Sequence, residues 1–293
     1  MKKLILTIAT AALIAGCGGS SGSSTDDAYT GPYRLSKIDI YADGAPRAAE
    51  LSYSYELVYG ADNYLSTLNQ LDSDGTQLES SAYTFDADGN LIKIVMSDET
   101  MEYNYDADGN LMSYTTDEGN DGESDEAVTY TYDAAGAMTG YNTYRPTDTM
   151  INSVRLSYDA EGTLATVEYD SEPDGVFEQV HTLTFDANGN LIEDAVTENS
   201  VADETKTYIH DAQNRLTKIE EDSDLDGSAD AYTDYEYDSD GKMTRVAYYE
   251  GAGVTPLREV LLTYDKGTEL GTDIVRTELY NDIVYKNIFM FGD

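Results

Sequence analysis

Acidic side chains alternate with other residues ahead of a glycine in several short stretches of this chain. The clearest stretch reads Asp222-Ser-Asp224-Leu-Asp226-Gly227 and is followed by Asp230. Oxygen ligands at the first, third and fifth positions before a glycine bend are typical of the first half of an EF-hand calcium loop. Two related stretches supply further candidate calcium ligands: Asp117, Asp121 and Asp125 in one, and Asp170, Glu172, Asp174 and Glu178 in the other.

The complete EF-hand pattern is absent, because the twelfth position is Thr233 and the flanking segments have strand patterning. The loops resemble more closely the short Asp-rich loops of thrombospondin type 3 repeats, which have an acid three residues after the Gly. The alternative is a solvated acidic turn, for which the turn propensities of Asp and Gly suffice. Fainter versions of the acidic turn are Asp72-Ser-Asp74-Gly75 and Asp39…Asp43-Gly44.

A second pattern recurs along most of the chain and predicts the elements that carry these loops. It consists of an aromatic residue, Asp, two residues, Gly, one residue, and Leu or Met, and successive Asp residues lie 20 to 27 positions apart. A period in this range indicates a repeat protein. The seven copies have their turn residues at Asp86 and Gly89, Asp106 and Gly109, Asp133 and Gly136, Asp159 and Gly162, Asp186 and Gly189, Asp211 and Asn214, and Asp238 and Gly241.

Each copy is predicted to be one β-hairpin. The Asp accepts a hydrogen bond from the backbone two residues later, and the Gly supplies the left-handed residue of a bulged hairpin. Where Gly is missing the residue is Asn214, and Asn tolerates positive φ better than most residues. Before the turn, Val128, Tyr130 and Tyr132 alternate with threonines, which is period-two strand patterning.

The aromatic-Asp-x-x-Gly-x-Leu pattern resembles the YD repeats of the RHS family over roughly residues 80–265. In that family the repeats form long antiparallel sheets that coil into shells enclosing a polypeptide. The resemblance implies an all-β fold, an elongated antiparallel meander of repeated β-hairpins coiled as an RHS/YD-type sheet of about 20 strands. The chain is expected to be too short to close such a shell.

The beginning of the chain resembles a bacterial lipoprotein signal. Two lysines precede an apolar segment over residues 4–13 that is too short to span a membrane. Residues 14–17 then read Ile-Ala-Gly-Cys, which resembles a lipobox that directs lipid attachment to Cys17. We therefore expect a signal peptide over residues 1–16, a lipidated cysteine with a flexible Gly/Ser-rich tether over 17–32, and a repeat domain over 33–293. Gly18 follows Cys17, so resemblance to Gram-negative lipoproteins favours a lipid anchor in the outer membrane.

Composition excludes some partners and leaves others open. The formal net charge of −40 repels phosphate backbones, so no nucleic-acid partner is expected, while divalent cations are attracted. The chain has 26 Tyr, 5 Phe and no Trp. The tyrosines are expected to form either cross-strand packing ladders or a surface that stacks on sugar rings. The hydrophobic residues 283–291 are expected to form a capping strand, the alternative being a docking strand for a partner.

No catalytic constellation is recognisable. His210 occupies the aromatic position of a repeat, and His181 alternates with apolar positions in a strand; neither has metal-ligand or triad spacing. Two suitably spaced carboxylates would suffice for a glycosidase. The regular use of Asp as a turn residue, however, makes most carboxylates of this chain structural.

The function expected from the sequence is therefore non-enzymatic. We expect a lipid-anchored cell-envelope protein that presents a repetitive β surface to a glycan, an envelope protein or another cell, with Ca²⁺ as its cofactor. One alternative is an accessory scaffold of an RHS or secretion system that holds a polypeptide cargo. The other is a carbohydrate-active enzyme.

Overall fold

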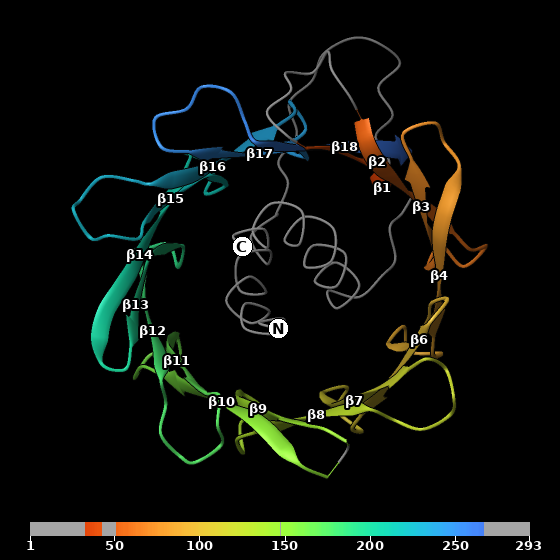
Figure 1. Ribbon diagram of the computed structural model, residues 1–293, viewed down its shortest axis with the longest axis horizontal. Helices are drawn as coiled ribbons and strands as arrows, with labels where there is room; N and C mark the ends of the chain where they lie inside the picture. The colour runs from red at the N-terminus through yellow and green to blue at the C-terminus, as the bar shows by residue number, and fades with distance from the viewer. Residues whose placement is uncertain (1–32, 43–50, 147, 267–293) are drawn as a thin grey trace. The chain divides into compact units, whose positions relative to one another are not determined.

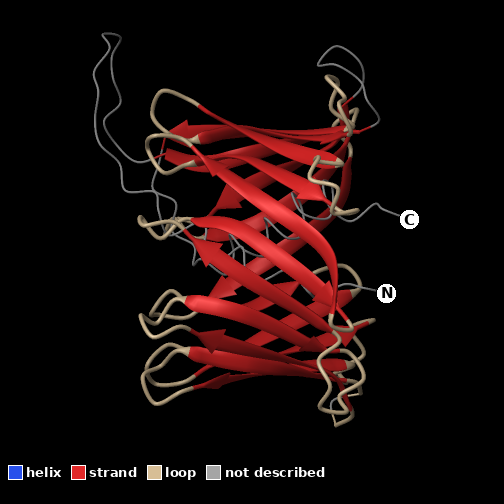
Figure 2. Ribbon diagram, turned by 90° about the vertical axis from the view of Figure 1, so that its left-hand side faces the viewer, coloured by secondary structure: helices blue, strands red, loops and turns tan. Residues whose placement is uncertain are grey.

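The computed structural model describes residues 33–42, 51–146 and 148–266, and in this part of the chain every regular element is a strand (Figure 2). No helix among these residues is long and apolar enough to cross a membrane. The strands are β1 (Tyr33–Ala42), β2 (Leu51–Tyr59), β3 (Leu65–Asp72), β4 (Gln77–Phe85), β5 (Leu91–Val95), β6 (Glu99–Tyr105), β7 (Leu111–Glu118), β8 (Glu126–Tyr132), β9 (Met138–Tyr144), β10 (Met150–Tyr158), β11 (Leu164–Asp170), β12 (Gln179–Phe185), β13 (Leu191–Glu198), β14 (Val201–His210), β15 (Leu216–Asp222), β16 (Ala231–Tyr237), β17 (Met243–Glu250) and β18 (Arg258–Lys266).

The 18 strands form one antiparallel sheet in which successive strands are hydrogen-bonded. Strand β1 pairs with both β2 and β18, which lie next to it in Figure 1, so neither the first nor the last described strand is left with a free edge on that side. The all-β prediction of antiparallel hairpins is confirmed. The prediction of an open meander of about 20 strands, too short to close, is wrong, because pairing the first strand with the last satisfies backbone groups that two free edges would leave exposed.

The chain divides into two compact units. In the first, strands pair in the order β4-β3-β2-β1-β18-β17-β16. In the second, strands β5 to β14 pair consecutively. Each hairpin therefore contacts mainly the hairpins next to it in sequence, as expected for a repeat protein.

Tyrosines supply much of the buried face of the strands. Tyr103 faces Tyr114 across β6 and β7 with ring centroids 5.7 Å apart, and Tyr130 faces Tyr141 at 5.8 Å. Seven tyrosines of the described residues are buried, whereas Tyr158 is the one tyrosine among their large exposed hydrophobic side chains. The tyrosines therefore form cross-strand packing ladders, and a contiguous exposed aromatic strip is absent from this part of the chain.

The repeat turns have the predicted geometry. In the turn between β12 and β13, Oδ1 of Asp186 accepts the backbone N–H groups of Asn188 at 2.8 Å and Asn190 at 2.9 Å. The N–H of Gly189 donates to the Asp186 carbonyl at 3.1 Å, and Gly189 has φ +83°. Asn214 adopts φ +60°, which confirms the reason inferred for its replacement of Gly.

The aromatic position of the repeat joins neighbouring hairpins. A bulge precedes the turn, so that Phe185 pairs with Leu191. In three of the copies whose aromatic residue is Tyr, the hydroxyl donates to a backbone carbonyl of the preceding repeat. Such bonds join Tyr132 to the Leu111 carbonyl at 2.8 Å, Tyr158 to the Met138 carbonyl at 2.7 Å and Tyr237 to the Leu216 carbonyl at 2.8 Å.

Of the two fainter acidic turns predicted from the sequence, the one at Asp72 is corrected, and the one that begins at Asp39 lies partly outside the described residues. The N–H of Gly75 donates to the Asp72 carbonyl at 3.1 Å, and Asp72 Oδ1 accepts the Asp74 N–H at 2.9 Å, which is the repeat-turn pattern. Asp39 lies within β1 and forms an ion pair with Lys37 at 2.7 Å. The predicted signal and tether with Cys17, residues 43–50 and the C-terminal stretch 283–291 lie outside the described residues.

Candidate functional site

The acidic loop between β11 and β12 brings three carboxylates together. Ligand oxygens of Asp170, Asp174 and Glu178 lie within 4.8 Å of one another. The Asp170 side chain is buried and accepts the backbone N–H of Asp174 at 3.2 Å and of Gly175 at 2.7 Å. The backbone N–H of Ser171 bonds Glu178 and lowers the pKa of this carboxyl. Glu172 is exposed and lies outside the cluster.

The other two acidic loops differ from each other. Oxygens of Asp222, Asp224 and Asp226 also lie within 4.8 Å of one another, whereas Asp230 is exposed and is not part of that group. In the third loop, Asp117 accepts the backbone N–H of Asp121 at 3.0 Å, and Asp125 accepts that of Glu118 at 2.8 Å. The carboxylates of this third loop do not form such a group. The structure therefore brings together six of the eleven candidate ligands, three in each of the first two loops.

His181 has a partner that the sequence did not reveal. Its Nδ1 lies 2.9 Å from Asp194 Oδ2, and both side chains are buried. The His181 ring meets the Tyr169 ring edge-on at 5.4 Å. His181 and Asp194 face each other diagonally across β12 and β13, a relation that depends on strand register and has no signature in residue spacing.

An additional copy of the repeat turn, not identified from the sequence, connects β2 to β3. Gly60 stands in the Asp position, Asn63 in the Gly position with φ +67°, and Leu65 in the Leu position. The N–H of Gly60 donates to the Tyr64 carbonyl at 2.8 Å, and that of Asn63 to the Gly60 carbonyl at 3.0 Å, as in the regular turns. The signal that could have revealed it is Gly60 lying 26 residues before Asp86.

The side chains of this divergent turn are arranged differently from those of the regular turns. Gly60 has no carboxylate, and Oδ1 of Asp62 accepts the Tyr64 N–H at 3.1 Å in its place. The place of Tyr64 is held by Asn, Ala, Thr, Arg or Lys in the seven predicted copies. The divergent turn therefore has both an aromatic ring and an exposed carboxylate.

Tyr64 reaches from the β2–β3 turn to the β4–β5 turn. Its ring stacks on Phe85 with centroids 4.8 Å apart and an interplanar angle of 23°. A Cβ atom on Gly89 would lie 2.4 Å from the Tyr64 hydroxyl, so the ring occupies space that only a glycine leaves open. That hydroxyl makes no hydrogen bond to another described residue, unlike the hydroxyls of Tyr132 and Tyr158.

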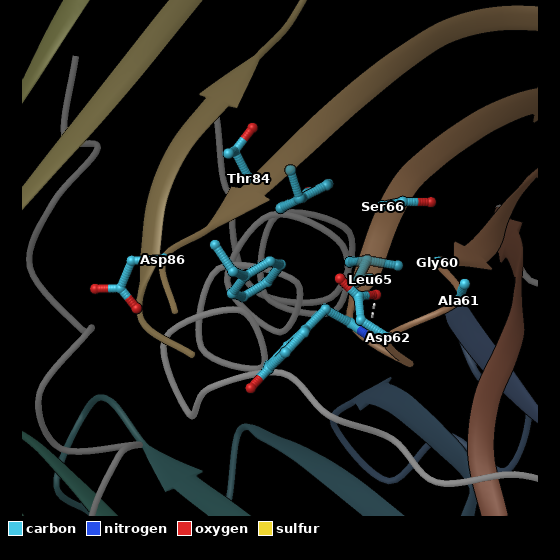
Figure 3. Close-up of a pocket in the computed structure, with 10 residues that line it drawn as sticks. Gly60, Ala61, Asp62, Leu65, Ser66, Thr84 and Asp86 are labelled. Carbon is cyan, nitrogen blue, oxygen red and sulfur yellow. Dashed lines mark hydrogen bonds between the residues drawn. The ribbon is translucent and has the colours of Figure 1, made fainter. Parts of the chain in front are cut away.

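These groups line a cavity of about 430 Å³, which we call the aromatic pocket (Figure 3). Its volume falls in the range of roughly 300–1,000 Å³ that is usual for small-molecule sites. The lining comes from the divergent turn, the start of β3, the end of β4 and the first residue of the β4–β5 turn: Gly60, Ala61, Asp62, Tyr64, Leu65, Ser66, Tyr83, Thr84, Phe85 and Asp86.

The two carboxylates of the pocket have different roles. Asp86 belongs to the regular β4–β5 turn, and its oxygens accept the Asn90 N–H at 2.9 Å and the Asn90 side-chain amide at 3.0 Å. The Asn90 amide and the turn N–H groups hold the pKa of Asp86 below its usual value. In Figure 3 the Asp86 carboxylate points away from Asp62. Asp62 therefore offers the pocket a carboxylate that the turn uses only in part.

Comparison with known proteins gives a distant structural likeness. No protein-family model and no curated protein matches the chain. A porin-like protein from Bacteroides uniformis aligns at 14% identity over 79% of this chain and 96% of that one, with a TM-score of 0.42. The TcdB2-TccC3-TEV structure aligns at 15% identity over 69% of this chain, with a TM-score of 0.34. This chain spans 14% of the length of that one.

A structure of the Photorhabdus luminescens Tc holotoxin pore aligns at 16% identity, covers 71% of this chain and 15% of that one, and has a TM-score of 0.30. Because no family model matches, the resemblance to YD repeats stays a prediction.

Proposed function

We propose that this chain is a non-catalytic, lipid-anchored protein of the bacterial outer membrane that binds a saccharide in the aromatic pocket. The observation that carries the proposal is the stacked pair of Tyr64 and Phe85 beside the partly free carboxylate of Asp62. Sugar rings have apolar faces that pack on aromatic side chains, and their hydroxyls bond to carboxylates and hydroxyls. The pocket lining has both kinds of group, and it also includes Ser66, whose hydroxyl donates to the Val58 carbonyl at 3.0 Å, and Thr84.

The arrangement of the carboxylates favours binding over hydrolysis. A glycosidase needs one carboxyl group that is protonated as the acid and a second that acts as nucleophile or base. Asp86 is committed to its turn, and its lowered pKa keeps it ionised, so it is unsuited to be the acid. One accessible carboxylate and an aromatic platform are sufficient for recognition.

A glycan array followed by isothermal titration calorimetry tests the proposal. We expect the full-length protein to bind at least one saccharide class, and Tyr64→Ala to abolish detectable binding because the aromatic platform is lost. Tyr158→Ala is the matched control, since Tyr158 is an exposed tyrosine outside the pocket. The proposal fails if no saccharide binds, or if both variants bind as the parent does.

The lipid anchor is tested separately. If Cys17 carries the lipid, metabolic labelling with a radioactive fatty acid should label the parent protein and leave Cys17→Ser unlabelled. The parent should fractionate with the outer membrane, and the variant should appear in the soluble fraction. Equal labelling of both proteins would contradict the anchor.

We also propose that the loop of Asp170, Asp174 and Glu178 binds Ca²⁺. The three side chains fit a hard cation because their oxygens converge, and waters or carbonyls would complete the six to eight ligands that Ca²⁺ takes. Calcium at a hundred times its Kd would stabilise the fold by ~2.7 kcal/mol. We expect calcium to raise Tm relative to EDTA, and Asp174→Asn to reduce this effect more than Asp121→Asn, which lies in a loop without the cluster. An unchanged Tm would remove the proposal.

A further inference from the structure

The aromatic pocket carries negative charge that no cation in its lining balances. Asp62 and Asp86 are among the lining residues, which include no Lys, Arg or His. Asp62 is exposed and makes no ion pair with another described residue. Arg34 stacks on the Tyr59 ring at 4.7 Å and does not line the pocket. A positively charged ligand would therefore gain electrostatic energy that a neutral ligand does not.

The geometry of Asp62 provides a specific acceptor for a cation. Its Oδ1 accepts the Tyr64 N–H at 3.1 Å, and its Oδ2 has no hydrogen bond to another described residue. A hydrogen bond from an ammonium group to a carboxylate is about twice as strong as one between neutral groups. The Tyr64 and Phe85 rings add attraction, because the faces of aromatic rings are electronegative.

Asp86 contributes charge without direct contact. Its carboxylate is held in its own turn by Asn90 and points away from Asp62 (Figure 3). It is therefore not placed to compete with Asp62 for the ligand, yet it adds to the negative field on the side of Phe85. Uronic acids and phosphorylated sugars would be repelled by the same field.

We propose that the aromatic pocket recognises a saccharide with a free, protonated amino group, the ammonium bonding to Oδ2 of Asp62 and the sugar ring lying on the aromatic pair. This inference rests on the proposed function, because it specifies the class of sugar that the pocket takes. It distinguishes amino sugars from the neutral N-acetylated sugars that share their ring and linkage.

The test is calorimetry on the full-length protein with two disaccharides, β-1,4-linked glucosamine and its fully N-acetylated counterpart. We expect the free amine to bind about tenfold or more tightly, as hydrogen bonds between charged groups allow. Asp62→Asn keeps an oxygen for the Tyr64 N–H and removes the charge, so it should lower the affinity for the amino sugar to that for the acetylated one. The regular turn accepts Asn at this position naturally, as Asn188 shows.

Asp108→Asn is the matched control. Asp108 holds the position of Asp62 in a regular turn, is exposed, and lies outside the pocket. If Asp62→Asn and Asp108→Asn lowered the affinity for the amino sugar equally, the ligand would be attracted by the net charge of the protein alone, and the inference would be overturned. Equal affinity for both sugars, still abolished by Tyr64→Ala, would overturn the inference and leave the proposed function standing. Failure of both sugars and of every glycan on the array would overturn the two together.

Discussion

The regular turn at Asp186 and the divergent turn at Gly60 have the same backbone hydrogen-bond pattern but use their side chains differently. In the regular turn, the carboxylate accepts two backbone N–H groups, and the Asn190 amide bonds its second oxygen at 2.9 Å. In the divergent turn, Asp62 accepts a single N–H, and Tyr64 replaces the asparagine. The regular turn therefore uses its polar groups for its own stability, whereas in the divergent turn Oδ2 of Asp62 has no hydrogen bond to another described residue.

The comparison shows where function is to be sought in a repeat protein. In the regular copies, the Asp carboxylates accept the backbone hydrogen bonds of the turn. Folding alone therefore explains these residues, and no further role has to be assigned to them. The divergent copy departs from the repeat at Gly60 and Tyr64 and lies beside the cavity. Departures from a local rule without a folding gain are expected at functional sites.

The largest expected effect is a loss of stability on adding a methyl group to Gly89, which lies against the Tyr64 side chain. Gly89→Ala places Cβ against the Tyr64 hydroxyl in a residue with φ +89°, so we expect a loss of about 2–5 kcal/mol of stability. Gly109→Ala has φ +85° and open space around its Cβ, and should cost about 1–2 kcal/mol. Urea denaturation measures both. Equal losses would mean that Tyr64 does not rest on Gly89.

A smaller effect separates the carboxylates of the two turns. Asp186→Ala removes the acceptor of two backbone N–H groups and of the Asn190 amide, so its Tm should fall by several degrees. Asp62→Ala removes the acceptor of one N–H and should lower Tm less. Differential scanning calorimetry would decide, and a larger fall for Asp62→Ala would reverse the roles assigned to the two turns.

Acid should weaken the regular turns. Asparagine amides and backbone N–H groups lower the pKa values of Asp86, Asp106 and Asp186 from an ordinary value of 3.8. Their contribution is therefore present above pH 3.8 and is lost as the pH falls below it through the folded-state pKa values. We expect the urea midpoint to fall in that window, and to fall less steeply in Asp186→Asn. A parallel fall in both proteins would contradict this assignment.

The smallest effect concerns tyrosine hydroxyls. Tyr132→Phe removes the bond to the Leu111 carbonyl and should cost about 0.5–1.5 kcal/mol of stability. Tyr64→Phe removes a hydroxyl without a described partner, so its stability should be unchanged while saccharide affinity falls. Chemical denaturation of both variants, with calorimetry of the second, tests the pair. A stability loss in Tyr64→Phe would indicate a structural role for that hydroxyl.

Local geometry was predictable because it depends on residues close in sequence. The period of the motif, the left-handed Gly or Asn, and the Asp that accepts from the residue two positions later are all properties of short segments. The divergent turn was not identified from the sequence, because Gly60 and Asn63 replace the Asp and the Gly by which the motif is recognised. The candidate calcium loops were recognised as a class, but which of them gather their carboxylates depends on how each loop closes.

The sequence by itself determined that this chain forms antiparallel hairpins with acidic turns, because alternation and turn chemistry act within a dozen residues. Only the tertiary structure decided that β1 joins β18, that Asp194 pairs with His181, and that Tyr64 stacks on Phe85. Each of these contacts depends on the register or placement of separate segments. Spacing along one chain carries no record of them, since the same hairpins could form an open sheet without them.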